Sequence, residues 1–379
     1  MKKLILSIVF LISGLVSINE SHAYLAAIRF GYPNCTTCHF NPSGGMTLTP
    51  YGRALSRELI STYGVEGEEN FLWGATDSIR PKWLELGADL RTSYVKNIEK
   101  PEKSVSRMTV SDLEVIATKE KIQALVDIGF RELSDGLSAE GKPQFKHNGF
   151  SRRHYLQYSL TDYWSVRGGK FSPNFGLWNA DPFNSVRAGI GLGDASETYN
   201  LEANYIGEDK SFSITGVLGS DAESTSKNEK GLFFTASKTI GPTYRLGVGG
   251  FSRENDFFKR SGFGEATFLG FSQRFYFYSE AYLQNVEDKL KETKSLGLYT
   301  FNRLGYEFLL KQAFFVLVSQ DMTIRKLGDN STRKEYFALG LQWMPRPHLE
   351  VQTHWRKTRD FSIGSDFGNE WVFNFHLYH

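Results

Sequence analysis

The two cysteines of this 379-residue chain lie three positions apart, in the stretch Asn34-Cys35-Thr36-Thr37-Cys38-His39. Several chemistries use such a pair. A C-x-x-C disulfide is a redox pair of the thioredoxin type, but that arrangement belongs to a βαβ setting, which this sequence does not predict. A zinc site needs four ligands, usually supplied by two such pairs, and this chain has one.

A histidine directly after the second cysteine favours a third chemistry. C-x-x-C-H is the spacing of a c-type haem attachment site. Two thiols at this spacing can reach the two vinyl groups of one porphyrin and form thioethers, and the next residue is then placed under the iron. We therefore expect one covalent haem c on Cys35 and Cys38, with His39 as the proximal ligand. The disulfide and the zinc site remain the alternatives.

The second axial ligand of such a haem is less narrowly specified. Met46 lies seven residues beyond His39, and methionine opposite histidine raises the haem potential. His348 and His376 are the rivals if their strands meet at one rim, and an open or water-ligated position is the third possibility. Candidate partners for the haem propionates are Arg29, Arg53 and Arg57. The alternative is that these arginines are ordinary solvated surface residues.

The N-terminus predicts export to the compartment where c-type haem is attached. Lys2 and Lys3 precede the apolar run 4–16, and 21–23 offers small residues for cleavage. We expect a signal peptide over 1–23 and a mature start near Tyr24, with an uncleaved anchor as the alternative. No later stretch reaches eighteen consecutive apolar residues, so a helical membrane protein is not expected.

Residues 24–82 form the first of two expected units. They hold the cysteines, a glycine-rich turn and one helix. Thr49-Pro50 predicts the start of that helix, as a cap followed by proline at the first helical position. Its apolar stripe is Leu55, Leu59 and Ile60, and it should end near Gly64. A unit this short cannot build a large core alone.

Residues 83–379 change to an alternation with period two. In 121–132, one face carries Ile122, Ala124, Val126, Ile128 and Phe130, and the other carries Gln123, Asp127 and Arg131. A soluble antiparallel sheet with one wet face shows the same pattern. The length of the segments, about ten residues or more, favours transmembrane strands. Aromatic residues make up 15% of the chain although its mean hydropathy is below zero, which is typical of a transmembrane barrel.

The expected connections alternate in length. Tight turns are predicted near 120–121, 161–162, 207–209, 241–242, 272–273 and 345–347, and longer loops at 134–148, 172–197, 219–230, 252–261, 285–294, 325–334 and 357–369. Short periplasmic turns and long outer loops are the outer-membrane pattern. We predict an all-β barrel of about sixteen antiparallel strands, with fourteen or eighteen as alternatives.

Charge and motifs exclude other classes. The formal net charge of +2 argues against a nucleic-acid footprint. The chain has no G-x-S-x-G, P-loop or H-E-x-x-H motif, so one-electron transfer is the only chemistry we assign. Charges expected on the lumen face, where they would hold the N-terminal unit, are Glu85, Asp89, Arg91, Asp127, Arg131, Arg153, Arg167 and Lys170.

The chain resembles the fused cytochrome–porins of the bacterial outer membrane, in which one C-x-x-C-H module precedes a barrel of about sixteen strands. The resemblance rests on Cys35, Cys38 and His39, on Phe30 and Tyr32 before them, and on the stretch 51–55 after them. The stretch 167–177 also looks like a porin strand that leads into a constriction loop. The best-known members of this family oxidise extracellular iron.

The resemblance implies a function, a location and partners. The haem module would lie on the periplasmic side of the outer membrane or within the lumen. Electrons would pass between a periplasmic carrier protein and an extracellular donor or acceptor such as iron, and the barrel would contact outer-membrane lipid. The alternative is a porin-like solute channel whose haem module is a plug or sensor. A third possibility is a ligand- or haem-sensing protein without electron transfer.

Overall fold

The computed structural model describes residues 25–379 except 33, 43, 46, 138–142, 177–184, 194–195, 221–227, 310–312, 363 and 365. The expected signal peptide and Met46 therefore lie outside the described residues. No helix in the described part of the chain is long and apolar enough to cross a membrane.

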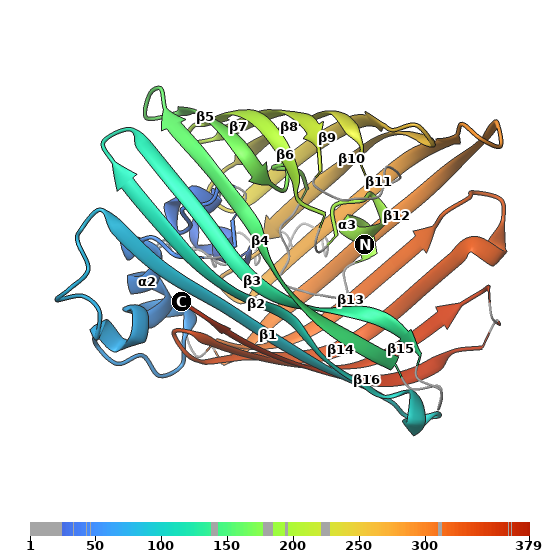
Figure 1. The fold of residues 1–379 in the computed structure, drawn as a ribbon. Helices are drawn as coiled ribbons and strands as arrows, with labels where there is room; N and C mark the ends of the chain where they lie inside the picture. The colour runs from blue at the N-terminus through green and yellow to red at the C-terminus, as the bar shows by residue number, and fades with distance from the viewer. Residues whose placement is uncertain are drawn as a thin grey trace, which may run out of the picture.

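Sixteen antiparallel strands close into a barrel, as the alternation predicted (Figure 1). β1 and β16 pair directly, with Asp89 opposite Tyr378, and each strand otherwise pairs with its neighbours in sequence. The strands are β1 (Leu84–Asn97), β2 (Val105–Lys119), β3 (Ile122–Leu137), β4 (Pro143–Ser159), β5 (Trp164–Phe171), β6 (Thr198–Ile206), β7 (Lys210–Gly219), β8 (Lys230–Ile240), β9 (Tyr244–Glu254), β10 (Phe258–Gly270), β11 (Phe275–Asp288), β12 (Thr293–Leu309), β13 (Phe314–Ile324), β14 (Arg333–Arg346), β15 (Leu349–Asp360) and β16 (Gly368–Tyr378).

The helical pieces are short. They are η1 (Leu25–Phe30), η2 (Cys35–Thr37), α2 (Pro50–Leu55), η3 (Ser56–Ile60), η4 (Phe71–Gly74), η5 (Pro101–Lys103), α3 (Ser185–Gly189) and η7 (Asn330–Thr332). The first five belong to the N-terminal module. The sixth, η5, lies in the connection between β1 and β2.

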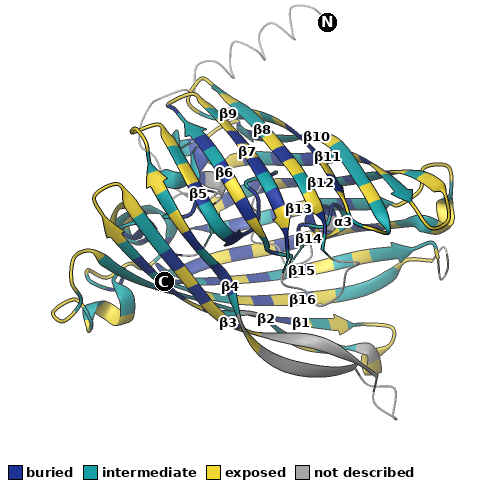
Figure 2. Cartoon of the chain, turned by 45° about the horizontal axis from the view of Figure 1, so that its top comes forward, coloured by how far each residue is buried: buried dark blue, intermediate teal, exposed yellow. Residues whose placement is uncertain are grey.

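Burial shows which face of the alternation points outward. On β3, Val126, Ile128 and Phe130 are exposed, whereas Leu125 and Asp127 are buried. Figure 2 shows the same alternation along strand after strand. A soluble sheet buries its apolar face and exposes its polar face. This barrel exposes large apolar side chains outward and buries charged ones inward, which is the pattern of a membrane barrel.

The connections near the N-terminal module are short, as predicted: 120–121, 160–163, 207–209, 241–243, 271–274 and 347–348. At the other end, 172–197 and 220–229 are long, also as predicted. The long loops expected at 134–148, 252–261 and 285–294 are wrong, since the strands leave only 138–142, 255–257 and 289–292 between them. These hairpins continue as paired strands, with charged contacts such as Lys289–Glu254 holding their tips.

The described parts of the connection 172–197 lie in the lumen, in agreement with the constriction loop that 167–177 indicated. It leaves β5 on one side of the barrel, and its helix α3 contacts β11, β12 and β13 on the other. Val186, Ile190 and Leu192 are buried there beside Phe175. The Arg187 guanidinium donates to the Phe175 carbonyl oxygen at 2.7 Å, which fastens the loop to itself.

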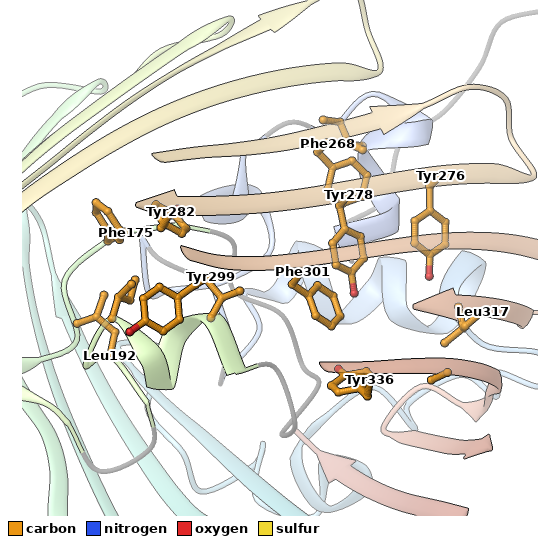
Figure 3. Packing of buried hydrophobic residues seen from close by; sticks show 14 of the residues in the cluster. Phe175, Leu192, Phe268, Tyr276, Tyr278, Tyr282, Tyr299, Phe301, Leu317 and Tyr336 are labelled. Carbon is orange, nitrogen blue, oxygen red and sulfur yellow. The ribbon is translucent and has the colours of Figure 1, made fainter. Parts of the chain in front are cut away.

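Aromatic side chains face the lumen as well as the lipid. The lumenal aromatic cluster consists of Phe175, Phe233, Phe251, Phe268, Tyr276, Tyr278, Tyr282, Tyr299, Phe301, Phe315 and Tyr336 (Figure 3). Tyr276 and Tyr278 stack with centroids 6.1 Å apart, and Tyr278 stacks on Phe301 at 5.8 Å. Glycine makes room for these rings: a Cβ on Gly305 would lie 2.2 Å from the Tyr276 ring.

Candidate functional site: the C-x-x-C-H turn in the mouth of the barrel

The N-terminal module, residues 25–82, lies at the end of the barrel where the C-terminus also lies (Figure 1). Its helix α2 begins at Pro50 as predicted, because the Gly52 amide donates to Thr49 Oγ1 at 3.0 Å. The helix continues as the π-helical turn η3 and stops at Ile60, short of Gly64. The backbone leaves it there because the Thr62 amide donates to the Met344 carbonyl at 2.9 Å.

The C-x-x-C-H residues form one tight helical turn. The amides of Cys38 and His39 both donate to the Cys35 carbonyl, at 3.1 and 2.9 Å. The two cysteines therefore sit three residues apart on a single turn. Cys38 is fully buried against Leu48 and Leu55, whereas Cys35 is half-buried. Both are free thiols.

The surroundings keep these thiols protonated when nothing is attached to them. Burial raises the pKa of Cys35, against the lowering effect of the Arg245 guanidinium that hydrogen-bonds to it from β9. Burial raises the pKa of Cys38 to about 12, and the neighbouring Cys35 adds to the shift. A reaction that needs the thiolate form at neutral pH, such as covalent attachment, is consequently favoured before the module packs into the barrel mouth and buries the two thiols.

Two glycines let backbone approach the turn closely. Gly44 has φ +81°, and a Cβ there would lie 3.2 Å from Cys35 Sγ and 4.0 Å from His39 Cδ2. A Cβ on Gly52 would lie 2.4 Å from the Cys38 carbonyl oxygen. The residues thus fit a covalent haem c in type and in local backbone: two thiols on one turn, an imidazole next, and a side-chain-free position beside them.

The two barrel histidines lie at the rim, as expected, but each has other partners. His348 Nε2 hydrogen-bonds to the Glu68 carbonyl oxygen of the module, and its ring stacks on His379 at 3.8 Å. His376 is held between two carboxylates, 3.2 Å from Asp89 and 2.9 Å from Glu350. Axial ligation by either histidine stays a prediction.

The Tyr378 ring connects these histidines to the cysteine turn. It lies 4.8 Å from the His376 ring and 6.4 Å from the His348 ring. It also packs against the buried cluster of Cys38, Leu48 and Leu55. The C-terminal strand therefore brings its last aromatic residue to the C-x-x-C-H turn.

The three arginines proposed for haem propionates bind protein carboxylates. Arg29 pairs with Glu307 of β12 at 2.8 Å, and Arg53 pairs with Glu85 of β1 at 3.0 Å. Arg57 remains within the module and pairs with Glu69 at 2.6 Å. Arg29 and Arg53 thus fasten the module to the barrel, and a role toward propionates stays a prediction.

The lumen charges named from the sequence divide into two groups. Glu85 and Arg167 contact the module. Glu85 pairs with Arg53, and Arg167 donates to Asn41 Oδ1 at 2.9 Å while it also pairs with Glu202 of the wall at 2.6 Å. The others join the polar network of the wall, where Arg153 lies 3.7 Å from Asp127. Asp89 and Lys170 are also buried in this wall, and the partly buried Arg91 pairs with Asp89. The side chain of Arg131 lies outside the described residues.

Further contacts around the mouth were not anticipated from the sequence. The Thr47 amide donates to Glu114 of β2 at 2.9 Å, and Asn34 Nδ2 donates to the Gly207 carbonyl at 3.0 Å. Arg346 binds Glu68 at 2.8 Å. No local pattern announces these pairs, because each joins residues far apart in the chain. Together with Arg29 and Arg53 they attach the module to strands and turns around the barrel end.

Comparison with known proteins finds the fold and no family. No family model matches the chain, and no curated protein matches it. Among solved structures, OmpT of Vibrio cholerae matches with TM-score 0.59 and 10% identity, over 79% of this chain and 99% of OmpT. An anion-selective porin from Comamonas acidovorans matches with TM-score 0.58 and 10% identity, over 78% of this chain and 99% of the porin.

Pseudomonas putida OprB matches with TM-score 0.60 and 10% identity, over 81% of this chain and 96% of OprB. At these identities the likeness is one of fold. The protein therefore has the closed sixteen-stranded fold of outer-membrane porins, to which residues 25–82 add a module in one mouth.

Proposed function

We propose that this protein is a porin-like solute channel of the bacterial outer membrane, whose haem-bearing N-terminal module fills only part of the periplasmic mouth, as a partial plug or sensor. The outward apolar side chains suit a lipid environment. Short connections at the module's end fit the periplasmic side, and contacts with β1, β2, β5 and β12 hold the module in the mouth.

Passage of small polar solutes is the function that the fold supports best. The observation that carries it is the inward face of β1 to β6, where ion-paired charged side chains line the lumen. Liposome swelling tests it. Proteoliposomes with the full-length protein should swell in small sugars faster than empty liposomes. Equal rates would contradict a solute channel.

The second candidate is one-electron transfer, and the observation that favours it is the C-x-x-C-H turn inside the plug. Cys35 and Cys38 would hold a haem c covalently and His39 would bind its iron; the bound group supplies reversible one-electron redox chemistry. This chain's residues bury the turn, exclude water from Cys38 and fix the module in the mouth.

A haem-stained gel of the outer-membrane fraction tests attachment and location together. Wild-type protein should stain, Cys35→Ala should not, and Thr36→Ala should stain like wild type as a matched control in the same turn. A stain that persists in Cys35→Ala would contradict the attachment site.

The electron-transfer candidate has its own test in intact cells. The proposed partners are an extracellular donor such as Fe(II) and a periplasmic electron-carrier protein. An Fe(II) complex that cannot cross the outer membrane should give the reduced haem spectrum in wild-type cells and not in Cys35→Ala cells. A stained protein that responds to no impermeant donor or acceptor would contradict this function.

A further inference from the structure

The outward face of β10 to β13 carries polar side chains where a membrane barrel needs apolar ones. On β11 the even-numbered residues, such as Tyr276 and Tyr278, point into the lumenal aromatic cluster, so the odd-numbered ones point outward (Figure 3). Strand pairing extends this assignment to the neighbouring strands. We call the outward polar side chains that it brings together the outward polar patch: Glu265, Thr267, Ser279, Thr300, Asn302 and Gln320.

The outward polar patch lies within the apolar band of the barrel and not at its edges. On β12, Asn302 lies midway between Leu296 and Phe308, which are both outward and exposed. On β10, Glu265 follows the exposed outward Phe263 and is itself partly exposed. The patch therefore faces hydrocarbon, which offers no hydrogen bonds, and a charge on this face destabilises a membrane barrel.

Hydrogen bonds within one copy satisfy part of the outward polar patch. The Glu265 carboxylate accepts from Thr267 Oγ1 at 2.5 Å and from Ser279 Oγ at 3.0 Å. Asn302 Nδ2 donates to Gln320 Oε1 at 2.6 Å. A carboxylate can accept about four hydrogen bonds, and each amide nitrogen has two hydrogens to donate. The β10 side of the patch can thus accept further bonds, and the β12 side can donate one.

The two sides of the patch are complementary about β11. Glu265 lies on the strand that pairs with one edge of β11, and Asn302 lies on the strand that pairs with its other edge. A two-fold axis along the membrane normal, in front of β11, places β10 of one copy opposite β12 of the other. Each pair of copies then has two matching contacts between a Glu265 carboxylate and an Asn302 amide.

We propose that the outward polar patch is the surface on which a second copy of this chain docks within the membrane, about this two-fold axis. Glu265 accepts a hydrogen bond from Asn302 of the second copy, and apolar neighbours such as Phe263 and Leu304 pack around the contact. The second copy supplies the polar partners that lipid cannot supply. The inference rests on the placement of the barrel in the membrane, and on neither solute passage nor haem.

The mass of the purified full-length protein in mild detergent tests the association, measured by size-exclusion chromatography with light scattering. Wild type should elute with the mass of two copies. Glu265→Leu and Asn302→Leu should each elute as one copy and stay folded, because each replaces a lipid-facing polar group by an apolar one. Thr353→Leu is the matched control, since Thr353 lies outward on β15 between Leu341 and Phe373, and it should elute as two copies.

Mixing the two variants in lipid vesicles tests the two-fold arrangement. Glu265→Leu keeps the amide and Asn302→Leu keeps the carboxylate, so a mixed pair retains one of the two contacts and a like pair retains none. Energy transfer between dye-labelled copies should therefore be higher in the mixture than in either variant alone. A monomeric or three-copy wild type, variants that stay paired, or equal energy transfer in all vesicles would overturn the proposal.

Discussion

At the scale of single residues, Gly44 and Gly45 separate backbone strain from contact with the cysteine turn. Both have positive φ, +81° and +74°, but only Gly44 faces Cys35. Gly44→Ala should therefore lower the fraction of protein that carries covalent haem more than Gly45→Ala does. Both alanines would have an unfavourable positive φ, but only the Cβ at position 44 would crowd Cys35. Haem absorbance per milligram of purified protein measures this, and equal yields would contradict a role for Gly44 at the site.

Arg29 and Glu307 form a deeply buried ion pair between module and barrel, with side chains 4% and 1% exposed. Arg29→Met leaves the Glu307 carboxylate buried without its cation, which typically costs about 3–5 kcal/mol. The module should then detach more readily, seen as faster proteolysis within residues 25–82.

The double variant Arg29→Met with Glu307→Gln is the control for this link. It removes both charges and should restore much of the protection, because no uncompensated carboxylate remains. Single and double variants that are cleaved equally fast would show that the ion pair does not hold the module.

At the scale of elements, the end of β16 and the turn between β14 and β15 hold the module through a pair of neutral histidines. Burial lowers the pKa of His379 to about 3, with the neighbouring His348 adding to the shift. Burial also lowers the pKa of His348. The folded contact therefore binds fewer protons than the open one, whose histidines titrate near 6.5.

The contact should be fully stable above about pH 6.5 and weaken as the pH falls below that value. Hydrogen exchange of residues 64–80, corrected for intrinsic rates, should be faster at pH 5 than at pH 7.5. His379→Phe keeps a ring against His348 and Phe71, whose own ring lies 5.2 Å from His379, and it should reduce this acid effect. Identical exchange at both pH values would contradict the prediction.

At the scale of the whole molecule, the outward apolar face has a consequence that depends on depth in the membrane. Val126 lies outward near the middle of the expected span of β3, and Ile122 lies outward at its short-turn end. Val126→Arg should cost about 2–4 kcal/mol, and Ile122→Arg about 0–1 kcal/mol, because an arginine near the interface keeps its charge in water. Urea unfolding in lipid vesicles measures both, and equal costs would contradict the membrane placement of β3.

The lumen of this molecule is divided. β8 to β14 contribute aromatic rings that pack with the constriction loop and with Ile28 and Ile60 of the module, whereas β1 to β6 contribute paired charges. The aromatic half therefore joins module, loop and wall into one packed core, whereas the polar half is held together by ion pairs between neighbouring strands.

The sequence by itself determined the features that depend on local spacing. Alternation with period two specifies strands and their two faces, a helix cap specifies where α2 begins, and the C-x-x-C-H spacing specifies the attachment chemistry to be tested. Such signals come from residues within a few positions of one another. For the same reason the alternation overestimated three loops, since it cannot show where paired strands leave the membrane and continue as hairpins.

Only the tertiary structure decided which distant residues meet. It placed Arg29 on Glu307, Cys35 beside Arg245, and the Tyr378 ring against the cysteine turn. It also left the Asn374 amide buried without a partner at the closing seam. These contacts depend on the strand register and on closure of β1 against β16, a property of the whole ring of strands that no local stretch of sequence encodes.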